Sequence, residues 1–350
     1  MNSLFDKGYI KAVASVVPKN VVSLDTLYEK ESKYRKKIIH TTGIENIRVA
    51  DKDKTTVDYC INAANLLFKH DIIKKENIDG IVLVTQTGDY IMPASSVILQ
   101  DRLGLRTDIV AFDINYGCSG YIYGLLQAFM LIETGICNNV LLCVGDTISK
   151  YINPNDKSVK MVMGDAASAT IVSKSFEINK TDFIFYTNGA GFKDLIIPAG
   201  GNRSPHIPGI TDKCESDEYG NVRCQENLYM NGLEIMNFSL EVVPILVNSI
   251  LKKLSIRKED IGLYCLHQAN KFIVERLIKK LKIDSEKTPI FLNNIGNTGS
   301  ASIPVLLSGI SDISRYDLAK VLLCGFGVGL SAGVVITNMS RTIILPIKEM

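Results

Sequence analysis

Cys118 is the first residue whose type and position point to chemistry. It follows an apolar, β-rich run at residues 110–114 and Gly117, and it precedes Ser119, Gly120 and a helical run. A cysteine at such a strand-to-helix turn lies at a helix N-terminus, where the dipole and free amides favour the thiolate. The flanking glycines permit a sharp turn that lifts the side chain out. The pattern predicts a nucleophile, with a buried structural cysteine as the alternative.

His267 and Asn297 are the other two candidates. His267 ends an apolar run at residues 261–266, and the carboxyl end of a parallel strand faces the crevice where α/β proteins bind ligands. Asn297 lies in a Gly- and Asn-rich turn at residues 293–300. A hydrogen-bonded, half-buried histidine and an ordinary turn asparagine are the structural alternatives.

An internal repeat links these candidates. Three pairs of segments resemble each other in order, namely 80–86 with 262–268, 112–120 with 291–299 and 140–145 with 321–326, at offsets of 182, 179 and 181. The repeat places Asn297 where the first half has Cys118. Duplication therefore predicts that the two residues occupy pseudo-equivalent turns that face one cleft.

The elements that must position these residues alternate between strands and helices, which predicts a largely parallel α/β sheet in each half. We expect strands at 81–85, 110–114, 140–144, 169–172, 261–266, 289–292, 321–324 and 333–337, and helices at 56–70, 119–134, 271–280 and 302–310. Residues 1–175 form the first predicted half and residues 232–350 the second. Between them, 176–231 is predicted to be a loop-rich insertion near the site entrance, or else a solvated surface insertion without a role.

Composition excludes several classes of function. The chain has 350 residues, 46% hydrophobic and 22% charged, as in a soluble globular protein. The balance of 39 basic and 37 acidic residues gives no broad basic face, which argues against nucleic acid as the main partner. The longest uncharged apolar stretch, 321–337, is Gly-rich and predicts two buried strands rather than a membrane span. No signal peptide is visible, so we expect a cytoplasmic protein with no membrane association.

The eight cysteines show no CxxC pair and no zinc-finger spacing with histidine, so no metal site is expected. Cys214 and Cys224 lie in one polar stretch and are close enough in sequence to approach each other. In a cytoplasmic chain we expect them to be reduced.

Taken together, the motifs resemble the β-ketoacyl-acyl-carrier-protein synthase III family of the thiolase superfamily. The resemblance covers nearly the whole chain and rests on DINYGCSG at 113–120, GDAA at 164–167, MNGLEIM at 230–236, HQAN at 267–270, GNTGSASIP at 296–304 and GFGVG at 325–329. It implies a five-layered αβαβα fold built by duplication, which agrees with the repeat, and a homodimer.

The resemblance also implies a Cys-His-Asn triad of Cys118, His267 and Asn297. Cys118 would be acylated by an acyl-CoA or acyl-carrier-protein thioester. Backbone amides of Cys118 and of Gly327, Val328 and Gly329 would hold the oxyanion. His267 and Asn297 would donate hydrogen bonds to the enolate formed when malonyl-acyl-carrier protein loses carbon dioxide, and no metal or redox cofactor is needed.

Some residues depart from the family pattern. The stretch 36–44, KKIIHTTGI, lacks the Trp and Arg with which acetyl-CoA-using members grip the adenine, and the chain has no Trp. This favours a carrier-protein-bound or otherwise unusual donor. Met92 stands where family members often carry a Phe that reaches across the dimer, which predicts a roomier acyl pocket. Lys271, with Lys279 and Lys280, is predicted to contact an acidic carrier protein, or else to belong to a solvated basic face.

Related functions remain as alternatives. A hydroxymethylglutaryl-CoA synthase needs a catalytic Glu where this chain has Gln86, which does not act as an acid. A thiolase would need a second catalytic cysteine near 325–329, and Cys324 lies just before that loop. An acyltransferase that forms esters or amides often loses the Asn or His, and a non-catalytic partner subunit of a condensing complex loses the Cys.

Overall fold

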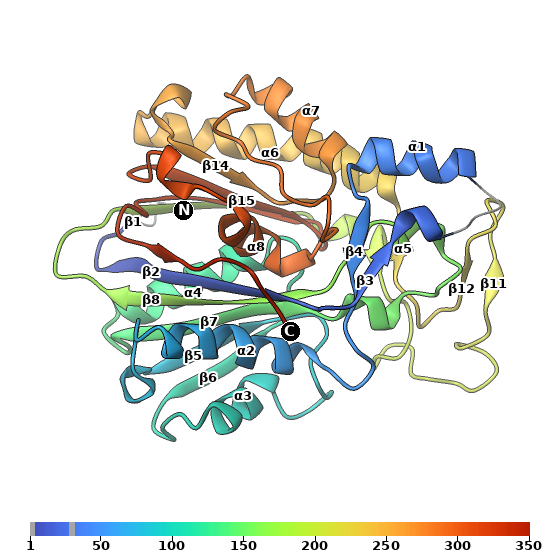
Figure 1. Cartoon of the computed structure of the whole chain (residues 1–350), viewed down its shortest axis with the longest axis horizontal. Coiled ribbons are helices and arrows are strands. Elements are labelled where there is room, and N and C mark those ends of the chain that lie inside the picture. Colours follow the sequence, from blue (N-terminus) through green and yellow to red (C-terminus); the bar gives the residue numbers. More distant parts are fainter. Residues whose placement is uncertain (1–3, 28–31) are drawn as a thin grey trace.

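Two β-sheets form the centre of the computed structural model, which describes residues 4–27 and 32–350 (Figure 1). One sheet has the order β17-β2-β8-β7-β5-β6, with β18 also paired to β2, and the other has the order β1-β9-β16-β15-β14. The strands of the two sheets are β1 (Leu4–Phe5), β2 (Gly8–Val17), β5 (Gly80–Val84), β6 (Val110–Ile114), β7 (Asn139–Asp146), β8 (Ala166–Lys174), β9 (Thr181–Thr187), β14 (Leu263–Leu266), β15 (Val321–Gly327), β16 (Ser331–Thr337), β17 (Ile343–Ile344) and β18 (Lys348–Glu349).

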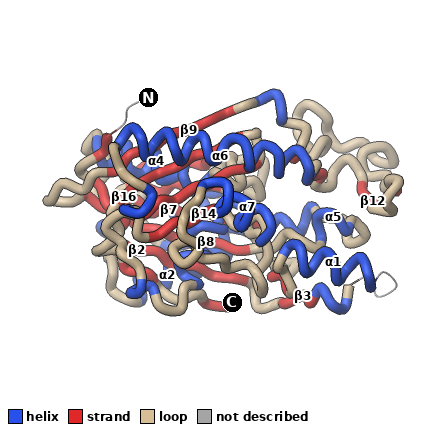
Figure 2. The backbone as a smooth tube through the Cα atoms, turned by 90° about the horizontal axis from the view of Figure 1, so that it is seen from above, coloured by secondary structure: helices blue, strands red, loops and turns tan. Residues whose placement is uncertain are grey.

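Helices cover the outer faces of both sheets and fill the space between them (Figures 1 and 2). The helices are α1 (Ser32–Thr42), α2 (Thr56–Lys69), α3 (Ser95–Leu103), α4 (Gly120–Glu133), α5 (Lys157–Lys160), α6 (Gly232–Leu254), α7 (Lys271–Leu281) and α8 (Ser302–Gly309). α2 and α3 pack on one sheet, α6 and α7 cover the other, and α4 and α8 contact both sheets. This arrangement confirms the predicted five-layered αβαβα fold.

The two sheets share a topology. β5-β7-β8-β2 and β14-β15-β16-β9 each begin with a parallel pair and continue with antiparallel pairs. The repeat segments that start at Gly80 and Gly262 correspond to β5 and β14, and those that start at Val140 and Val321 correspond to β7 and β15. The internal repeat is therefore visible in the strand order. The prediction of a largely parallel sheet is wrong for the second sheet, where only β14 and β15 pair in parallel, because a short turn joins β15 to β16 as an antiparallel hairpin and β9 and β1 continue antiparallel.

One predicted strand is wrong. Residues 289–292 join no ladder, although their counterpart β6 does. The Phe291 amide instead donates to the Gln268 side chain at 2.9 Å, and the carbonyl of the following Asn293 accepts from Glu45 at 2.8 Å. These loop contacts satisfy the backbone without a partner strand. The other predicted strands and helices are present, with ends shifted by a few residues.

Two apolar stretches are long enough to be compared with a membrane-spanning segment. Residues 321–337 form the buried antiparallel pair β15 and β16, as predicted. Among the described residues, α6 is the helix long and apolar enough to cross a membrane. Half of its most apolar window is buried against β9, β15, β16 and α7, as in a core helix.

The loop-rich segment contains the short strand pairs β10 (Leu195–Ile196) with β13 (Tyr229–Met230), and β11 (Glu215–Ser216) with β12 (Val222–Arg223). It lies at the end of the molecule that carries α1, α5 and the pair β3 (Val21–Ser23) and β4 (Asn46–Arg48) (Figure 1). β9, which falls inside the predicted 176–231 segment, is a full member of the second sheet. Each sheet therefore contains strands from more than one of the three predicted segments. The bounds of these segments stay a prediction.

Candidate active site

Cys118 lies in the turn between β6 and α4, with 7% of its surface exposed. Glycines of β15 allow this turn to lie directly on the other sheet. A Cβ added at Gly327 would lie 2.8 Å from Cys118 Cβ and 3.0 Å from its Sγ, and one at Gly325 would lie 2.8 Å from Ser119 Cα. Gly327 also has a φ of +150°, which larger residues rarely adopt. The GFGVG motif therefore packs against the candidate nucleophile.

Two effects oppose each other at the Cys118 thiol. The backbone amides of Val328, in the loop after β15, and of Cys118 itself lower the pKa of the thiol and so favour the thiolate. Burial outweighs them and raises the pKa of Cys118 to about 12. The expected preference for the thiolate is therefore wrong for the free thiol, which is protonated at neutral pH and must lose its proton during attack. The two amides that reach Sγ are half of the predicted oxyanion set.

His267 follows β14, and its ring is fixed on two sides. Its backbone amide donates to the Cys324 carbonyl at 2.8 Å, and its ring meets Phe326 edge-on with centroids 5.3 Å apart. Nδ1 lies 2.5 Å from Ser302 Oγ, at the start of α8. Burial lowers the pKa of His267 to about 3, so the ring is neutral at physiological pH. Nε2 has no hydrogen-bond partner within 4–27 and 32–350 and is the ring nitrogen left for a ligand.

Asn297 is held by its backbone, which leaves its side chain for another role. Its amide donates to the Val162 carbonyl at 2.8 Å, and its carbonyl accepts from Gly164 at 2.9 Å. Gly164 is needed for this approach, because a Cβ there would lie 2.1 Å from the Ile295 carbonyl oxygen. The Gly164–Asp165 turn thus has a structural role in holding the Asn297 turn.

β15 brings Cys118 and His267 together, and the Asn297 turn closes the same site. Gly327 lies against Cys118, while Phe326 lies against His267. Gly299, two residues after Asn297, lines one cavity with Cys118. Consecutive residues of β15 thus contact Cys118 and His267, and the turn that carries Asn297 reaches the Cys118 cavity through Gly299. That the three residues act as one triad stays a prediction.

Sequence reasoning missed Asp146, the last residue of β7. Its carboxylate is buried and accepts from the Gln86 amide at 2.8 Å, from Ser300 Oγ at 2.8 Å and from Thr85 Oγ1 at 3.2 Å. Burial raises the pKa of Asp146 to about 6, although these hydrogen bonds oppose the shift. The available signal was an acidic residue at the carboxyl end of a buried strand, β7, in the same sheet as β6, which precedes Cys118. Asp146 joins the turn after β5 to the turn that carries Asn297.

The cavity above Cys118 has a volume of about 180 Å³. Its polar end is formed by Gln86, Asn115 and Asp146, and the loop-rich segment supplies the apolar wall of Leu195, Ile197 and Leu228. Residues of the 176–231 segment therefore line the cavity that contains Cys118, which favours a segment near the site entrance over a surface insertion without a role.

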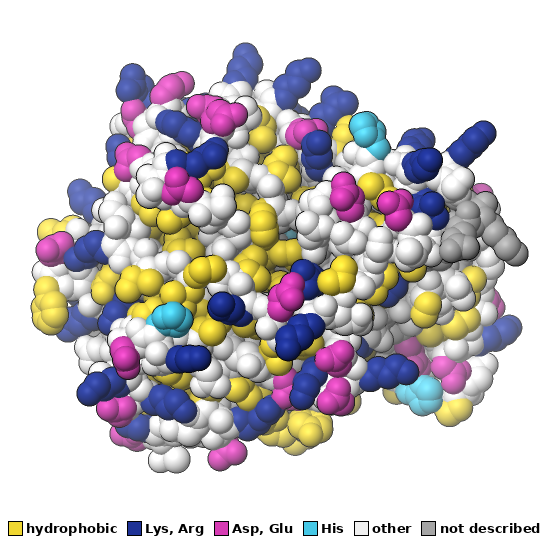
Figure 3. Space-filling model, in the orientation of Figure 1, with side chains coloured by type: hydrophobic (Ala, Val, Ile, Leu, Met, Phe, Trp, Pro, Cys, Tyr) yellow, Lys and Arg dark blue, Asp and Glu magenta, His cyan; other side chains and the backbone are white. Residues whose placement is uncertain are grey.

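Met92 and Lys271 lie outside this cavity. Met92 is 80% exposed beside Tyr90 and Ile91, which are 67% and 95% exposed, so a single chain does not bring it to Cys118. Lys271 begins α7 and lines a surface hollow of about 550 Å³ with Lys36, His40 and Gly43 of the 36–44 stretch. Figure 3 shows Lys and Arg side chains along the edge formed by α6, α7 and α1, with some acidic side chains between them. Lys279 and Lys280 lie at the far end of α7.

Comparisons with known proteins agree with this site. Residues 112–189, which include Cys118, match the family model described as 3-oxoacyl-[acyl-carrier-protein (ACP)] synthase III, and residues 251–339, with His267 and Asn297, match its C-terminal model. The chain is 32% identical to a β-ketoacyl-[acyl-carrier-protein] synthase III of Fusobacterium nucleatum, over 93% of this chain and 96% of that protein.

Two solved structures are similar over almost the full length. One, a 3-oxoacyl-(acyl-carrier-protein) synthase III, shares 38% identity at a TM-score of 0.91, covering 95% of this chain and 99% of its own. The other, a 3-oxoacyl-(acyl-carrier protein) synthase from Burkholderia xenovorans LB400, shares 33% identity at a TM-score of 0.91, covering 100% of this chain and 99% of its own.

Proposed function

The chain belongs to the 3-oxoacyl-[acyl-carrier-protein] synthase III family, and on this basis we propose how its own residues carry out the condensation. It is a condensing enzyme of the acyltransferase type with a thiolase-like fold. The observation that carries the assignment of residues is the position of β15, which contacts Cys118 through Gly327 and His267 through Phe326.

In the first half-reaction, Cys118 Sγ attacks the carbonyl carbon of an acyl thioester and gives up its proton. The carbonyl oxygen becomes an oxyanion, which the amides of Cys118 and of the loop Gly327, Val328 and Gly329 stabilise. The tetrahedral intermediate collapses, the donor thiol leaves with a proton, and the acyl group stays on Cys118. The Val328 and Cys118 amides that reach Sγ in the free thiol support this role.

In the second half-reaction, malonyl-acyl-carrier protein loses carbon dioxide and forms a thioester enolate. The negative charge gathers on the thioester oxygen, to which His267 Nε2 and Asn297 Nδ2 donate hydrogen bonds. The α-carbon then attacks acyl-Cys118, and the β-ketoacyl product leaves as the thiol is regenerated. Loss of carbon dioxide drives the condensation, so we propose that neither a metal nor a redox cofactor takes part.

The neutral state of His267 supports a hydrogen-bonding role over an acidic one, because its pKa is lowered to about 3. The presence of both donors favours condensation over the formation of an ester or amide. Cys118 with its two amide donors argues against a non-catalytic partner subunit.

We place the protein in the cytoplasm as a homodimer that works with acyl carrier protein. Tyr90, Ile91 and Met92 form an exposed apolar tip, and a second copy would cover it. In that dimer, Met92 would reach the partner's acyl cavity. The 36–44 stretch and Lys271 line one hollow, which supports a carrier-protein-bound acyl donor.

Intact-protein mass spectrometry tests the proposal. The protein is mixed with a panel of acyl-CoA and acyl-carrier-protein thioesters, with Cys118→Ala as the control. We expect an acyl mass on the unmodified chain alone, which malonyl-acyl-carrier protein discharges into a β-ketoacyl product. An adduct that persists on Cys118→Ala, or one that malonyl-acyl-carrier protein does not discharge, would contradict the assignment.

A further inference from the structure

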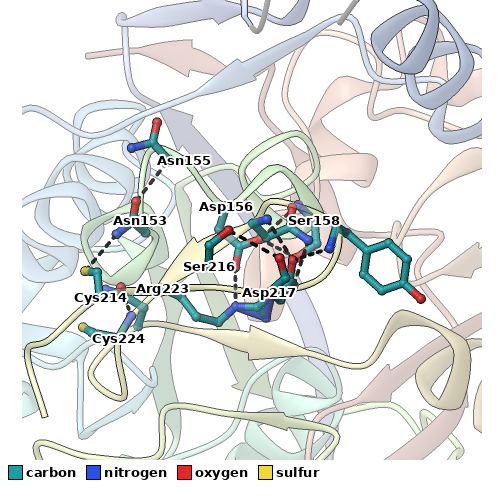
Figure 4. Close-up of polar contacts among 12 residues, drawn as sticks. Asn153, Asn155, Asp156, Ser158, Cys214, Ser216, Asp217, Arg223 and Cys224 are labelled. Atoms are coloured by element: carbon teal, nitrogen blue, oxygen red, sulfur yellow. Dashed lines mark hydrogen bonds and ion pairs between the residues drawn. The ribbon is translucent and has the colours of Figure 1, made fainter.

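Cys214 and Cys224 lie side by side at the base of the β11–β12 hairpin (Figure 4). The ladder pairs Glu215 with Arg223, so one step further along the two strands Cys214 faces Cys224. Residues that face each other on antiparallel strands have Cα atoms about 4.5 or 5.5 Å apart. Both spacings fall within the range of about 4.4–6.8 Å that a disulfide accepts.

The backbone hydrogen bonds of the hairpin indicate that Cys214 and Cys224 form a non-hydrogen-bonded pair, which has the shorter Cα–Cα distance of about 4.5 Å. The Asp217 amide donates to the Asn221 carbonyl at 2.9 Å, so these two form a hydrogen-bonded pair. Hydrogen-bonded and non-hydrogen-bonded pairs alternate along an antiparallel ladder, and Cys214–Cys224, three steps away, is non-hydrogen-bonded. In agreement, the Cys224 amide donates to Asn227 Oδ1 at 2.9 Å instead of across the hairpin.

The two thiols are adjacent and accessible. Both are free, and Asn153 Nδ2 lies 3.4 Å from Cys214 Sγ. Cys214 is exposed and Cys224 is partly exposed, whereas the other six cysteines are buried. A reagent in solution therefore reaches this pair before the others.

The remainder of the hairpin is already anchored, so the two thiols need little movement to meet. The Arg223 guanidinium pairs with Asp217 and lies 3.1 Å from the buried Asp156 carboxylate, and the Val222 amide donates to the Asn155 carbonyl at 3.2 Å (Figure 4). These contacts fix β12 against the segment that precedes α5.

The pair is also close in the chain to the acyl cavity. The Asn227 amide donates to the Cys224 carbonyl at 3.2 Å and forms a tight turn. The next residue, Leu228, donates to the Tyr151 carbonyl at 2.8 Å, and its side chain lines the cavity above Cys118. A bond at Cys224 would therefore restrict the turn that positions this wall.

We propose that Cys214 and Cys224 form a reversible dithiol–disulfide site that low-molecular-weight disulfides oxidise. One protein thiolate attacks the small disulfide, forms a mixed disulfide and releases one small thiol. The second protein thiolate attacks the protein sulfur of the mixed disulfide and releases the second small thiol. Two electrons and two protons pass from the cysteine pair to the oxidant, and a small thiol in excess reverses both steps.

Peptide mapping of the full-length protein after treatment with oxidised glutathione tests the bond. Trypsin cuts after Lys213 and Arg223, so Cys214 and Cys224 fall on separate peptides, 214–223 and 224–252. We expect these two peptides to be joined, to separate with dithiothreitol, and to be the only joined pair. Separate glutathione adducts on both peptides, a bridge between other cysteines, or two free thiols would overturn the site.

Two matched variants and a second measurement complete the test. Cys214→Ser should leave a stable mixed disulfide on Cys224, and Cys224→Ser should leave one on Cys214. In the oxidised protein, hydrogen exchange at the Leu228 amide should slow by about tenfold, because a closed loop has fewer open states. Unchanged exchange at Leu228 would overturn the connection to the acyl cavity. None of these readouts depends on the condensation.

Discussion

Asn297 Oδ1 accepts a hydrogen bond from the Gly299 amide at 3.0 Å. This bond fixes which end of the side-chain amide is free: the oxygen is occupied within the turn, and Nδ2 is left to donate. A donor with a fixed direction needs no reorganisation when charge develops on a thioester oxygen. The turn that sequence analysis predicted thus also orients the group that the reaction needs.

The first prediction concerns the side chains of Asn297 and His267 as hydrogen-bond donors to the enolate. Asn297→Ala and His267→Ala should lower malonyl decarboxylation by about a hundred- to a thousandfold each, the usual effect of removing one such donor. Acylation of Cys118 should change less, because it uses backbone amides. Stopped-flow acylation and carbon dioxide release measure the two steps.

Asn297→Asp is the matched control for this donor. The aspartate retains an oxygen for the Gly299 amide and is close in size, but its carboxylate has no hydrogen to donate. If Asn297→Asp decarboxylated malonyl-acyl-carrier protein at the normal rate, the enolate role of Asn297 would be wrong.

Ser302 is predicted to act as a positioning residue through His267. His267 can donate from Nε2 only in the tautomer whose Nδ1 accepts, and Ser302 Oγ, 2.5 Å away, supplies the hydrogen for Nδ1. A neutral hydrogen bond of this kind contributes about 1 kcal/mol, so Ser302→Ala should slow decarboxylation about fivefold. Acylation should remain unchanged, and Ser302→Thr should restore part of the rate.

Ser239→Ala provides the control for Ser302→Ala. Ser239 is also a buried helical serine, but its hydroxyl donates to the Ile235 carbonyl within α6. Equal losses of decarboxylation in the two variants would show a general effect of removing a buried hydroxyl and would contradict the tautomer argument.

The sequence was sufficient to select Cys118 and His267 as candidates, because each follows an apolar run that is a strand in the structure, and the repeat added Asn297. It was not sufficient for Asp146 and Ser302. Their roles depend on partners that lie far along the chain or on a different element, such as Ser300 for Asp146. Pairings of that kind follow from turn geometry and burial, which periodicity does not report.

Two of the errors have similar physical origins. The run at 289–292 has strand-like residues, but its backbone bonds to loops, so propensity was overridden by tertiary contacts. The Cys118 thiolate was expected from a helix N-terminus, and the amides do favour it, but burial has the larger effect on the pKa. The cost of burial depends on the whole packed site and cannot be derived from a local motif.

Asp146 and His267 are predicted to give opposite pH dependences of stability. The pKa of Asp146 is raised from 3.8 to about 6, so the folded state binds the extra proton and stability falls as pH rises from about 4 to 6. The pKa of His267 is lowered from 6.5 to about 3, so the unfolded state binds the extra proton and stability rises with pH between about 3 and 6.5. Between pH 4 and 6 the two effects largely cancel.

Single variants should reveal these opposing slopes in urea unfolding at several pH values. Relative to the unmodified chain, Asp146→Asn should gain stability as pH rises from 4 to 6, by up to about 3 kcal/mol. His267→Gln should lose stability over the same range, by a similar order of magnitude. The double variant should have the slope of the unmodified chain. Parallel slopes in all four proteins would contradict the two pKa shifts.

Lys271 is predicted to contact the acidic carrier protein. It begins α7 beside the hollow that the 36–44 stretch lines, and its ion pair with Glu275, at 3.8 Å between exposed groups, is too weak to neutralise it. Lys271→Glu should raise the KM for malonyl-acyl-carrier protein about tenfold at low salt, because a like charge then faces the carrier. The rise should shrink as salt increases. Decarboxylation of malonyl-N-acetylcysteamine, whose thiol portion carries no phosphate, should be unchanged, because the triad is intact.

Lys280→Glu is the control for the position of that contact. It makes the same change of charge on the same helix, nine residues and about 13 Å further along. If the carrier protein docks at the hollow, Lys280→Glu should change the KM for malonyl-acyl-carrier protein by less than about twofold. A general attraction between the carrier protein and a basic surface would instead raise the KM equally in both variants. Steady-state kinetics with malonyl-acyl-carrier protein and malonyl-N-acetylcysteamine at two salt concentrations therefore decide between a defined docking site at Lys271 and a solvated basic face.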